Sequence, residues 1–174
     1  MRMRGMVKFI KGTTNKPLKG AEIGVWKGEH ATGMLNSLEL EELFLVDPYE
    51  PYKLLCKETE KTIQTNDNMF NIVKDKFAGE DRVTLMKMRS IDAAEKFNDQ
   101  SFDFVYIDGN HNYEAVKEDI KVWYPKVVMG GVLGGHDYYH EWEGVVSAVN
   151  ELLLDMKLYI EGLDWWIIKD KETL

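Results

Sequence analysis

Residues 102–138 read FDFVYIDGNHNYEAVKEDIKVWYPKVVMGGVLGGHDY, and the architecture of the chain is clearest there. Two continuous apolar runs, 102–107 and 131–135, flank a segment at 113–124 in which apolar residues recur at helical spacing. Continuous apolar runs of this length are typical of strands that are buried on both faces, and a helix between two such strands makes a parallel crossover. The segment therefore predicts one βαβ unit of a doubly wound α/β sheet.

The rest of the chain continues the alternation of strands and helices. Further apolar runs lie at 21–26, 43–46, 83–88, 157–161 and 165–169, and one of the helical patterns between them extends from Ile63 to Phe77. Only three residues separate the last two runs, whereas a parallel crossover needs about a dozen. Those two strands must therefore form an antiparallel hairpin. The sequence predicts a seven-stranded, mostly parallel sheet with helices on both faces and one antiparallel strand near its end.

Length and composition limit the classes of function. The 174 residues suffice for one domain, predicted to span 1–174, and 44% hydrophobic residues indicate a packed core. Lys and Arg number 22 and Asp and Glu 30, a net charge of −8, whereas nucleic-acid-binding domains usually carry a basic surface. The single cysteine, Cys56, excludes an intrachain disulfide and fits a reducing compartment. Because the sequence has no signal peptide and no apolar run of the roughly 20 residues that span a bilayer, we expect a cytoplasmic protein that binds neither nucleic acid nor membrane.

A glycine turn follows the first predicted strand. Glu22, Gly24, Trp26 and Gly28 lie in the motif EIGVWKG, directly before a predicted helix. Glycines allow a sharp turn and the close approach of a ligand, and the helix N-terminus favours an anion or a carboxylate. Trp26 stands where the dinucleotide fingerprint G-x-G-x-x-G has its middle glycine, so the turn favours a ligand without a pyrophosphate.

A carboxylate follows the second predicted strand. Asp47 stands 19 residues after Gly28, at a strand end where a carboxylate can accept hydrogen bonds from the hydroxyls of a ribose. The alternative is that the glycines are ordinary turn residues and that Asp47 caps a helix before Pro48. Together, the glycine turn and Asp47 favour a nucleoside site.

Polar clusters follow both strands of the βαβ unit. Asp108 and His111 stand in the first cluster, DGNHNY, and His136 and Asp137 stand in the second, GGHDY. Ligands of open α/β sheets bind outside the carboxyl ends of the strands, so we expect these four side chains to face one crevice. Their oxygen and imidazole donors suit a divalent cation or acid–base chemistry.

A structural role is the alternative for these clusters. The aspartates would then cap the following helices, and the histidines would only complete the turns. The remaining histidines, His30 and His140, are expected at the surface.

The segments AEIGVWKGEHA, LFLVDPY and EWEGVVSAVNELL, together with residues 102–138, resemble class I S-adenosylmethionine-dependent methyltransferases. More narrowly, the chain is similar to a small group with an IDG-x-H-x-Y segment followed by GG-x-x-x-x-HDY, related to sugar O-methyltransferases. The resemblance runs from about Lys19 to the C-terminus. It implies a Rossmann-like fold with strand order 3-2-1-4-5-7-6 and strand 7 antiparallel.

The resemblance also implies roles for individual residues in binding S-adenosylmethionine. The glycine turn (Glu22, Gly24, Trp26 and Gly28) would shape the methionine side of the pocket, Asp47 would bind the ribose hydroxyls, Ser90 and Ile91 would contact the adenine, and Asp108 would begin the substrate side.

Relatives that methylate sugar hydroxyls have a metal-binding acid at the position of Asp108 and a base at that of His111. They carry two acids where this chain has His136 and Asp137. The histidine is unusual for Mg²⁺ but suits Mn²⁺ or Fe²⁺. The resemblance thus implies a divalent metal, Mg²⁺ or Mn²⁺, at Asp108, His136 and Asp137.

The leading hypothesis is an enzyme that transfers a methyl group from S-adenosylmethionine to a hydroxyl of a small-molecule or glycan acceptor. His111, with an ordinary imidazole pKa near ~6.5, would remove the acceptor proton, while Asp108 holds the acceptor. The alternatives are a non-catalytic module that binds a nucleoside or a partner protein, and a nicotinamide-dependent oxidoreductase, which Trp26 and the terminal hairpin disfavour. Because only about 18 residues precede the first strand, the pocket is either open or closed by a second subunit of a homo-oligomer.

Overall fold

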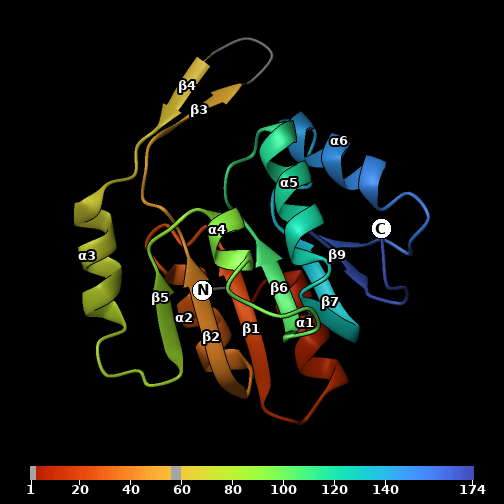
Figure 1. The fold of residues 1–174 in the computed structure, drawn as a ribbon, viewed down its shortest axis with the longest axis horizontal. Helices are drawn as coiled ribbons and strands as arrows, with labels where there is room; N and C mark the ends of the chain where they lie inside the picture. Colours follow the sequence, from red (N-terminus) through yellow and green to blue (C-terminus); the bar gives the residue numbers. More distant parts are fainter. Residues whose placement is uncertain (1–2, 56–59) are drawn as a thin grey trace.

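A seven-stranded sheet forms the centre of the protein, seen in a computed structural model that describes residues 3–55 and 60–174 (Figure 1). Its strands are β1 (Leu18–Ile23), β2 (Leu40–Val46), β5 (Val83–Met86), β6 (Phe102–Ile107), β7 (Val127–Gly135), β8 (Tyr159–Glu161) and β9 (Asp164–Ile168). Cys56, for which the sequence predicts no disulfide, lies outside the described residues.

The strand order is β5-β2-β1-β6-β7-β9-β8. The pairs from β5 to β7 are parallel, and β9 is antiparallel to both of its neighbours. This order corresponds strand by strand to the predicted 3-2-1-4-5-7-6, so both the topology and the antiparallel terminal strand are confirmed. The first strand ends three residues earlier than predicted, at Ile23, which leaves Gly24, Val25 and Trp26 in the loop at the carboxyl edge.

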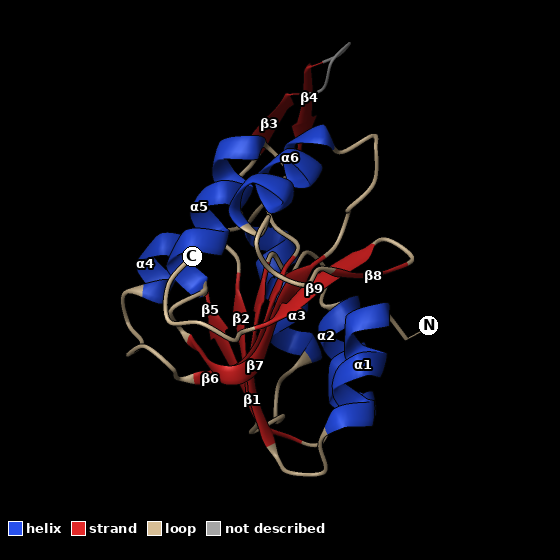
Figure 2. Ribbon diagram, turned by 90° about the vertical axis from the view of Figure 1, so that its right-hand side faces the viewer, coloured by secondary structure: helices blue, strands red, loops and turns tan. Residues whose placement is uncertain are grey.

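Helices cover both faces of the sheet, as predicted (Figure 2). Those on one face are α1 (Gly5–Thr13), α2 (Glu29–Ser37) and α3 (Asp67–Lys76), and those on the other are α4 (Ser90–Ala94), α5 (Tyr113–Trp123) and α6 (Glu143–Leu152). Side chains alternate along a strand, so Phe104 and Tyr106 of β6 enter the core beneath α1 and α2, while Val105 and Ile107 enter the core beneath α5 and α6. Among the described helices, none has the length and apolar character that crossing a membrane requires.

A second, two-stranded sheet stands above the carboxyl edge of the main sheet (Figure 1). It consists of β3 (Tyr52–Leu55) and β4 (Glu60–Ile63), which the sequence analysis did not predict. Ile63 is therefore in a strand, not in the predicted helix, which begins only at Asp67 because Asn66 caps it by accepting from the Met69 N–H at 3.1 Å. The hairpin contacts the main body where the Asn112 amide donates to the Lys53 carbonyl at 2.7 Å.

Helix α1 is a second element that the sequence analysis did not predict. Met6, Val7 and Ile10 of α1 are buried against the sheet. At its start, the Met6 N–H donates to Oδ2 of Asp164 in β9 at 3.0 Å, which satisfies one of the free donors of a helix N-terminus. This contact fixes the start of α1 at the carboxyl edge of the sheet and brings Arg4 to the site described next.

Candidate active site

A cavity of about 650 Å³ opens at the carboxyl ends of β1, β2, β6 and β7, a size typical of pockets for small molecules and cofactors. Ten of the residues predicted from the sequence line it: Glu22, Gly24, Trp26, Asp47, Ser90, Ile91, Asp108, His111, His136 and Asp137. The sheet therefore brings the predicted nucleoside residues and the predicted cluster of acids and histidines to one cavity.

The glycine turn is built on backbone conformations that favour glycine. Gly24 has φ +87°, and a Cβ atom there would lie 2.2 Å from the carbonyl oxygen of Asp108, which is too close for any side chain. Gly28 has φ +72° and starts α2, where a Cβ would lie 2.7 Å from the Phe77 ring. Gly28 thus allows α2 to pack against Phe77, and its assignment to the cofactor pocket stays a prediction.

Asp47 is engaged by the backbone of the glycine turn. Its Oδ2 accepts from the N–H groups of Val25 at 2.9 Å and Trp26 at 3.1 Å, and its Oδ1 accepts from the N–H of Tyr49 at 2.7 Å. No helix begins there, because β3 follows Asp47, so the alternative role as a helix cap is wrong. Asp47 shapes the turn, and its bond to ribose hydroxyls stays a prediction.

His30 is buried, which contradicts its expected place at the surface. Its side chain is 8% exposed, its Nδ1 lies 2.9 Å from Glu22 Oε1, and its ring packs 4.2 Å from that of Tyr106. Burial raises the pKa of Glu22, although the bond to His30 counteracts this. Oε2 of Glu22 is buried without a hydrogen-bond partner, so the wall of the cavity has an acceptor free for a ligand. His140 is exposed, as predicted.

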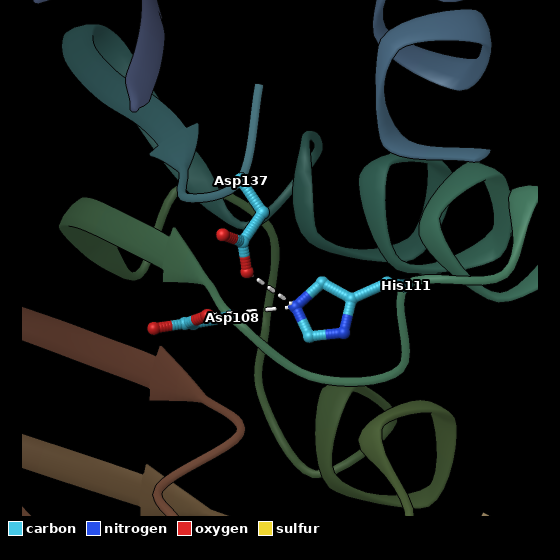
Figure 3. Close-up of side chains that lie close together, drawn as sticks. All are labelled: Asp108, His111 and Asp137. Carbon is cyan, nitrogen blue, oxygen red and sulfur yellow. Dashed lines mark ion pairs between the residues drawn. The ribbon is translucent and has the colours of Figure 1, made fainter. Parts of the chain in front are cut away.

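The side chains of Asp108, His111 and Asp137 point toward one another (Figure 3), and all three line the cavity. Nε2 of His111 lies 2.7 Å from Asp137 Oδ2 and 3.8 Å from Asp108 Oδ1. His136 joins the group, with its Nδ1 3.1 Å from Asp137 Oδ1 and 3.9 Å from Asp108 Oδ1. The structure thus places the four predicted side chains together, with the imidazole of His111 between the two carboxylates.

Arg4 holds the other side of Asp108, and the sequence analysis missed it. Its Nη1 lies 2.6 Å from Asp108 Oδ2 and donates to the Tyr106 hydroxyl at 2.8 Å. The Tyr106 hydroxyl in turn donates to Asp164 Oδ1 at 2.8 Å. Arg4 and Asp108 are 104 residues apart in sequence, so only the folded chain reveals the pair. Asp108 consequently offers one oxygen to Arg4 and the other to His111 and His136.

The two carboxylates change the protonation expected of His111. Burial alone would lower the pKa of this imidazole, but Asp108 and Asp137 outweigh burial and raise the pKa to about 9. The pKa values of Asp108 and Asp137 are lowered despite burial, mainly by His111 and, respectively, by Arg4 and His136. The two carboxylates therefore favour the protonated imidazole at neutral pH, in place of the ordinary pKa near ~6.5 expected from the sequence. The role of His111 as the base stays a prediction.

The donor set fits a divalent cation. Asp108, His111 and Asp137 each offer one ligand atom, and these atoms lie within 4.8 Å of one another. Nε2 of His111 is buried between the two carboxylates without an aligned hydrogen bond, and the carboxylates favour a proton on this imidazole. A cation between Asp108 and Asp137 would take over the electrostatic role of that proton. Of the predicted ligands, Asp108 and Asp137 belong to this set and His136 does not. Metal binding at these residues stays a prediction.

Aromatic side chains enclose His111. The ring of Trp142 stacks on the imidazole with 4.8 Å between centroids, and the Tyr52 hydroxyl lies 3.3 Å from Nδ1. Tyr52 comes from β3, so the hairpin forms a wall of the cavity. The hairpin therefore covers part of the pocket, which the sequence analysis expected to be either open or closed by a second subunit.

A buried carboxyl, Asp119 on α5, lines the cavity at the end where Ser90 and Ile91 lie. It is 7% exposed and hydrogen-bonds to the Ser90 side chain. Burial raises the pKa of Asp119 to about 7, although the bond to Ser90 counteracts part of this effect. The ionised form of this carboxyl therefore lowers the stability of the folded protein at neutral and alkaline pH.

Replacing Asp119 by asparagine should stabilise the protein at high pH relative to the parent. Because the folded pKa lies above the unfolded value of ~3.9, the parent loses stability as pH rises towards about 7, by roughly 2–3 kcal/mol between pH 5 and pH 8.5. The Asn variant has no such charge, so the difference in melting temperature between Asp119→Asn and the parent should grow over this range. Glu114→Gln removes an exposed acid of the same helix that does not act on the pKa of Asp119, and it should follow the pH dependence of the parent. A constant difference between Asp119→Asn and the parent would contradict the raised pKa.

Comparisons with known proteins agree with this architecture. The model of a family described as "Methyltransferase domain" matches residues 21–138. A curated relative, an uncharacterised protein of Acanthamoeba polyphaga mimivirus, is 28% identical over 142 residues, which cover 78% of this chain and 59% of the relative. The chain thus spans little more than half the length of that relative.

Solved structures of methyltransferases share the fold. The O-methyltransferase NovP aligns with a TM-score of 0.69 and 18% identity over 95% of this chain and 76% of NovP. MycE, a methyltransferase of the mycinamycin biosynthetic pathway solved with Mg, SAH and mycinamycin VI, aligns with a TM-score of 0.64 and 17% identity over 96% of this chain and 49% of MycE. At these identities the likeness shows the fold alone. Because the family model matches more than half of the chain, the chain belongs to the methyltransferase domain family.

Proposed function

We propose that this chain transfers the methyl group of S-adenosylmethionine to a hydroxyl oxygen of a small-molecule or glycan acceptor, with a divalent cation at the acceptor side. The observation that carries the proposal is the single cavity that joins the glycine turn to the cluster of Asp108, His111 and Asp137. A nucleoside cofactor at the turn and an acceptor at the cluster would meet inside it. The MycE complex with Mg and SAH supports both the cofactor and the cation.

The chain's own residues would mainly align the reactants. When bound, S-adenosylmethionine supplies an electrophilic methyl group on its sulfonium. Gly24 lets the turn pack against the loop that carries Asp108. Oε2 of Glu22, which has no hydrogen-bond partner in the cavity wall, would accept a hydrogen bond from the ligand. Holding two reactants in line can contribute several kcal/mol to lowering a barrier.

The cluster of Asp108, His111 and Asp137 would remove the proton of the acceptor hydroxyl. Asp108 and Asp137 would hold the cation, whose charge lowers the pKa of a hydroxyl near it. Arg4 fixes Oδ2 of Asp108 and so orients Oδ1 towards the cluster. His111, released from its proton when a cation occupies the carboxylates, would then accept the proton of the acceptor.

The cavity wall favours an acceptor with a ring. Trp142 and Tyr52 flank His111, and flat aromatic faces suit the faces of sugars and aromatic rings. The negative net charge of the chain disfavours nucleic acid as the acceptor.

We also propose that a second subunit of a homo-oligomer completes the cover over the cavity. A cytoplasmic location is a further part of the proposal.

Methyl transfer tests the proposal directly. The protein is incubated with S-adenosylmethionine and a panel of glycosides and phenols, and formation of S-adenosylhomocysteine is measured with Mn²⁺, with Mg²⁺ and with EDTA. We expect turnover of at least one hydroxyl acceptor, lost in EDTA and restored by either cation. Turnover that is equally fast in EDTA would remove the cation from the proposal and leave Asp108 as a polar anchor.

Binding of Mn²⁺ gives a readout that does not depend on the acceptor. Titration followed by electron paramagnetic resonance should show one site in the parent, and Asp137→Asn should weaken it at least about tenfold, because a charged ligand is lost. Glu141→Gln removes an exposed carboxylate from the same loop and should leave the affinity within about twofold. Equal weakening in both variants would indicate a diffuse charge effect instead of a site.

A further inference from the structure

Arg4 is held at the cavity by hydrogen bonds whose directions are fixed. Its Nη1 donates to the Tyr106 hydroxyl at 2.8 Å, and that hydroxyl donates to Asp164 Oδ1 at 2.8 Å. A phenol has one proton and an ionised carboxylate can only accept, so the Tyr106 oxygen must accept from Arg4. Asp164 is buried and also accepts from the Met6 N–H at 3.0 Å. The guanidinium is thereby tied to β6, to β9 and to the start of α1.

The same nitrogen of Arg4 occupies one oxygen of Asp108. Nη1 lies 2.6 Å from Asp108 Oδ2, and both side chains line the cavity. A guanidinium stays charged throughout the pH range in which proteins are folded, so deprotonation does not release this oxygen. Hydrogen bonds between charged groups are also stronger than those between neutral groups. Oδ2 of Asp108 is therefore not available to a second cation.

Only the other oxygen of Asp108 faces the histidines of the cluster. Oδ1 lies 3.8 Å from His111 Nε2 and 3.9 Å from His136 Nδ1. A cation at the cluster would thus receive one oxygen from Asp108. Ca²⁺ takes a large and flexible set of oxygen ligands and often binds both oxygens of a carboxylate, whereas the octahedral sites of Mg²⁺ and Mn²⁺ need only one. A carboxylate whose second oxygen is occupied therefore disfavours Ca²⁺ more than the smaller cations.

We infer that Arg4 is a specificity-determining residue of the cation site, because its bond to Oδ2 leaves one Asp108 oxygen for the cation and so favours Mn²⁺ or Mg²⁺ over Ca²⁺. The inference rests on the proposed function, because it assumes a cation between Asp108 and Asp137. Two positive charges repel, so Arg4 does not touch the cation. It acts through Asp108 as a positioning residue.

Competition between two cations measures this preference without any acceptor. The dissociation constant of Mn²⁺ is obtained by electron paramagnetic resonance on the full chain, and that of Ca²⁺ by displacement of bound Mn²⁺. We expect the parent to bind Mn²⁺ at least about tenfold more tightly than Ca²⁺. In Arg4→Met, Asp108 can offer both oxygens, so this preference should fall at least about fivefold. Loss of a positive charge strengthens the binding of both cations, and the ratio of the two constants is therefore the readout.

Three further variants assign the preference to the contact. Arg4→Lys keeps a cation that can pair with Oδ2 through one nitrogen, as Arg4 does, so the ratio should stay within about threefold of the parental value. Lys8→Met removes a positive charge of α1 that pairs with Glu161 and does not line the cavity, and it should keep the parental ratio. Melting curves show whether each variant is folded. Arg4→Gln is a second neutral variant that decides the point if Arg4→Met does not fold.

The outcomes separate the inference from the proposed function. Three results would each overturn the inference and leave the proposed cation site standing: a parental ratio in folded Arg4→Met, an equal fall in Lys8→Met, or equally tight binding of Ca²⁺ and Mn²⁺ by the parent. Absence of Mn²⁺ binding by the parent would overturn the cation of the proposed function and the inference with it.

Discussion

Substitution of Gly24 by valine is expected to abolish binding of S-adenosylhomocysteine, a loss of more than about 100-fold. A Cβ atom at this position would lie 2.2 Å from the Asp108 carbonyl oxygen and 2.5 Å from the Gly109 Cα, and the backbone has φ +87°. Both constraints act on backbone atoms, which cannot move aside as a flexible side chain can. The turn and the loop that carries Asp108 must therefore separate, and the ligand loses the surface on which it lies.

The same geometry determines what the variant does to the fold. The added side chain would enter the β6–α5 loop, where it meets backbone atoms. We therefore expect a lower melting temperature together with the loss of binding. Gly33→Ala is the matched control, because nothing lies within 4 Å of its Cβ position on α2. It should stabilise the fold by about 0.5–1 kcal/mol and leave binding unchanged. A Gly24→Val variant that binds with the parental dissociation constant would show that the turn faces something other than the cofactor.

Removal of the imidazole in His111→Ala should lower turnover by about 10²–10⁴-fold, the usual contribution of a positioned base. Cofactor affinity should barely change, because His111 lies at the cluster and not at the glycine turn. His140→Ala removes an exposed histidine and should retain parental turnover. His111→Asn tests the alternative in which the side chain only shapes the loop, since asparagine can still accept a hydrogen bond. Near-parental turnover of His111→Asn would remove His111 from the mechanism.

The pH profile of turnover follows from the carboxylates around His111. With the pKa raised to about 9, the imidazole is protonated and cannot accept a proton below that pH, so at low cation concentration the rate should rise with pH through about 9. Saturating Mn²⁺ competes with this proton for Asp108 and Asp137 and should move the rise towards the ordinary value of ~6.5. The measurement is turnover between pH 5.5 and pH 9.5 at low and saturating Mn²⁺, with any acceptor that is methylated. A profile that does not respond to the cation would contradict the shared site.

Features set by local sequence could be predicted. The apolar runs gave the strands because burial on both faces leaves no room for polar alternation, and the three-residue loop before Asp164 forced the antiparallel hairpin. The same reasoning placed Asp108 and Asp137 at neighbouring strand ends, since β6 and β7 pair in parallel. Each of these predictions needed only residues that are close in sequence.

Features set by distant partners could not be predicted. Arg4 reaches Asp108 only because Asp164 of β9 fixes the start of α1. His30 is buried because Glu22 pairs with it across the β1–α2 turn, while its sequence context is polar. Each strand of the β3–β4 hairpin has only four residues, and its longest apolar run is Leu54–Leu55, so its pattern did not stand out from a loop. The pKa of His111 depends on Asp137, which lies on the next strand end, and so the charge state of the site follows from the fold.

Calorimetric titration of the parent protein with S-adenosylhomocysteine tests the central claim most directly, because it needs neither the acceptor nor the cation. The account predicts one site with a dissociation constant in the micromolar range, which corresponds to about −8 kcal/mol, and no measurable binding of NAD under the same conditions. Absence of heat with S-adenosylhomocysteine, or binding of NAD with comparable affinity, would contradict the claim that this cavity is the cofactor site of a methyltransferase.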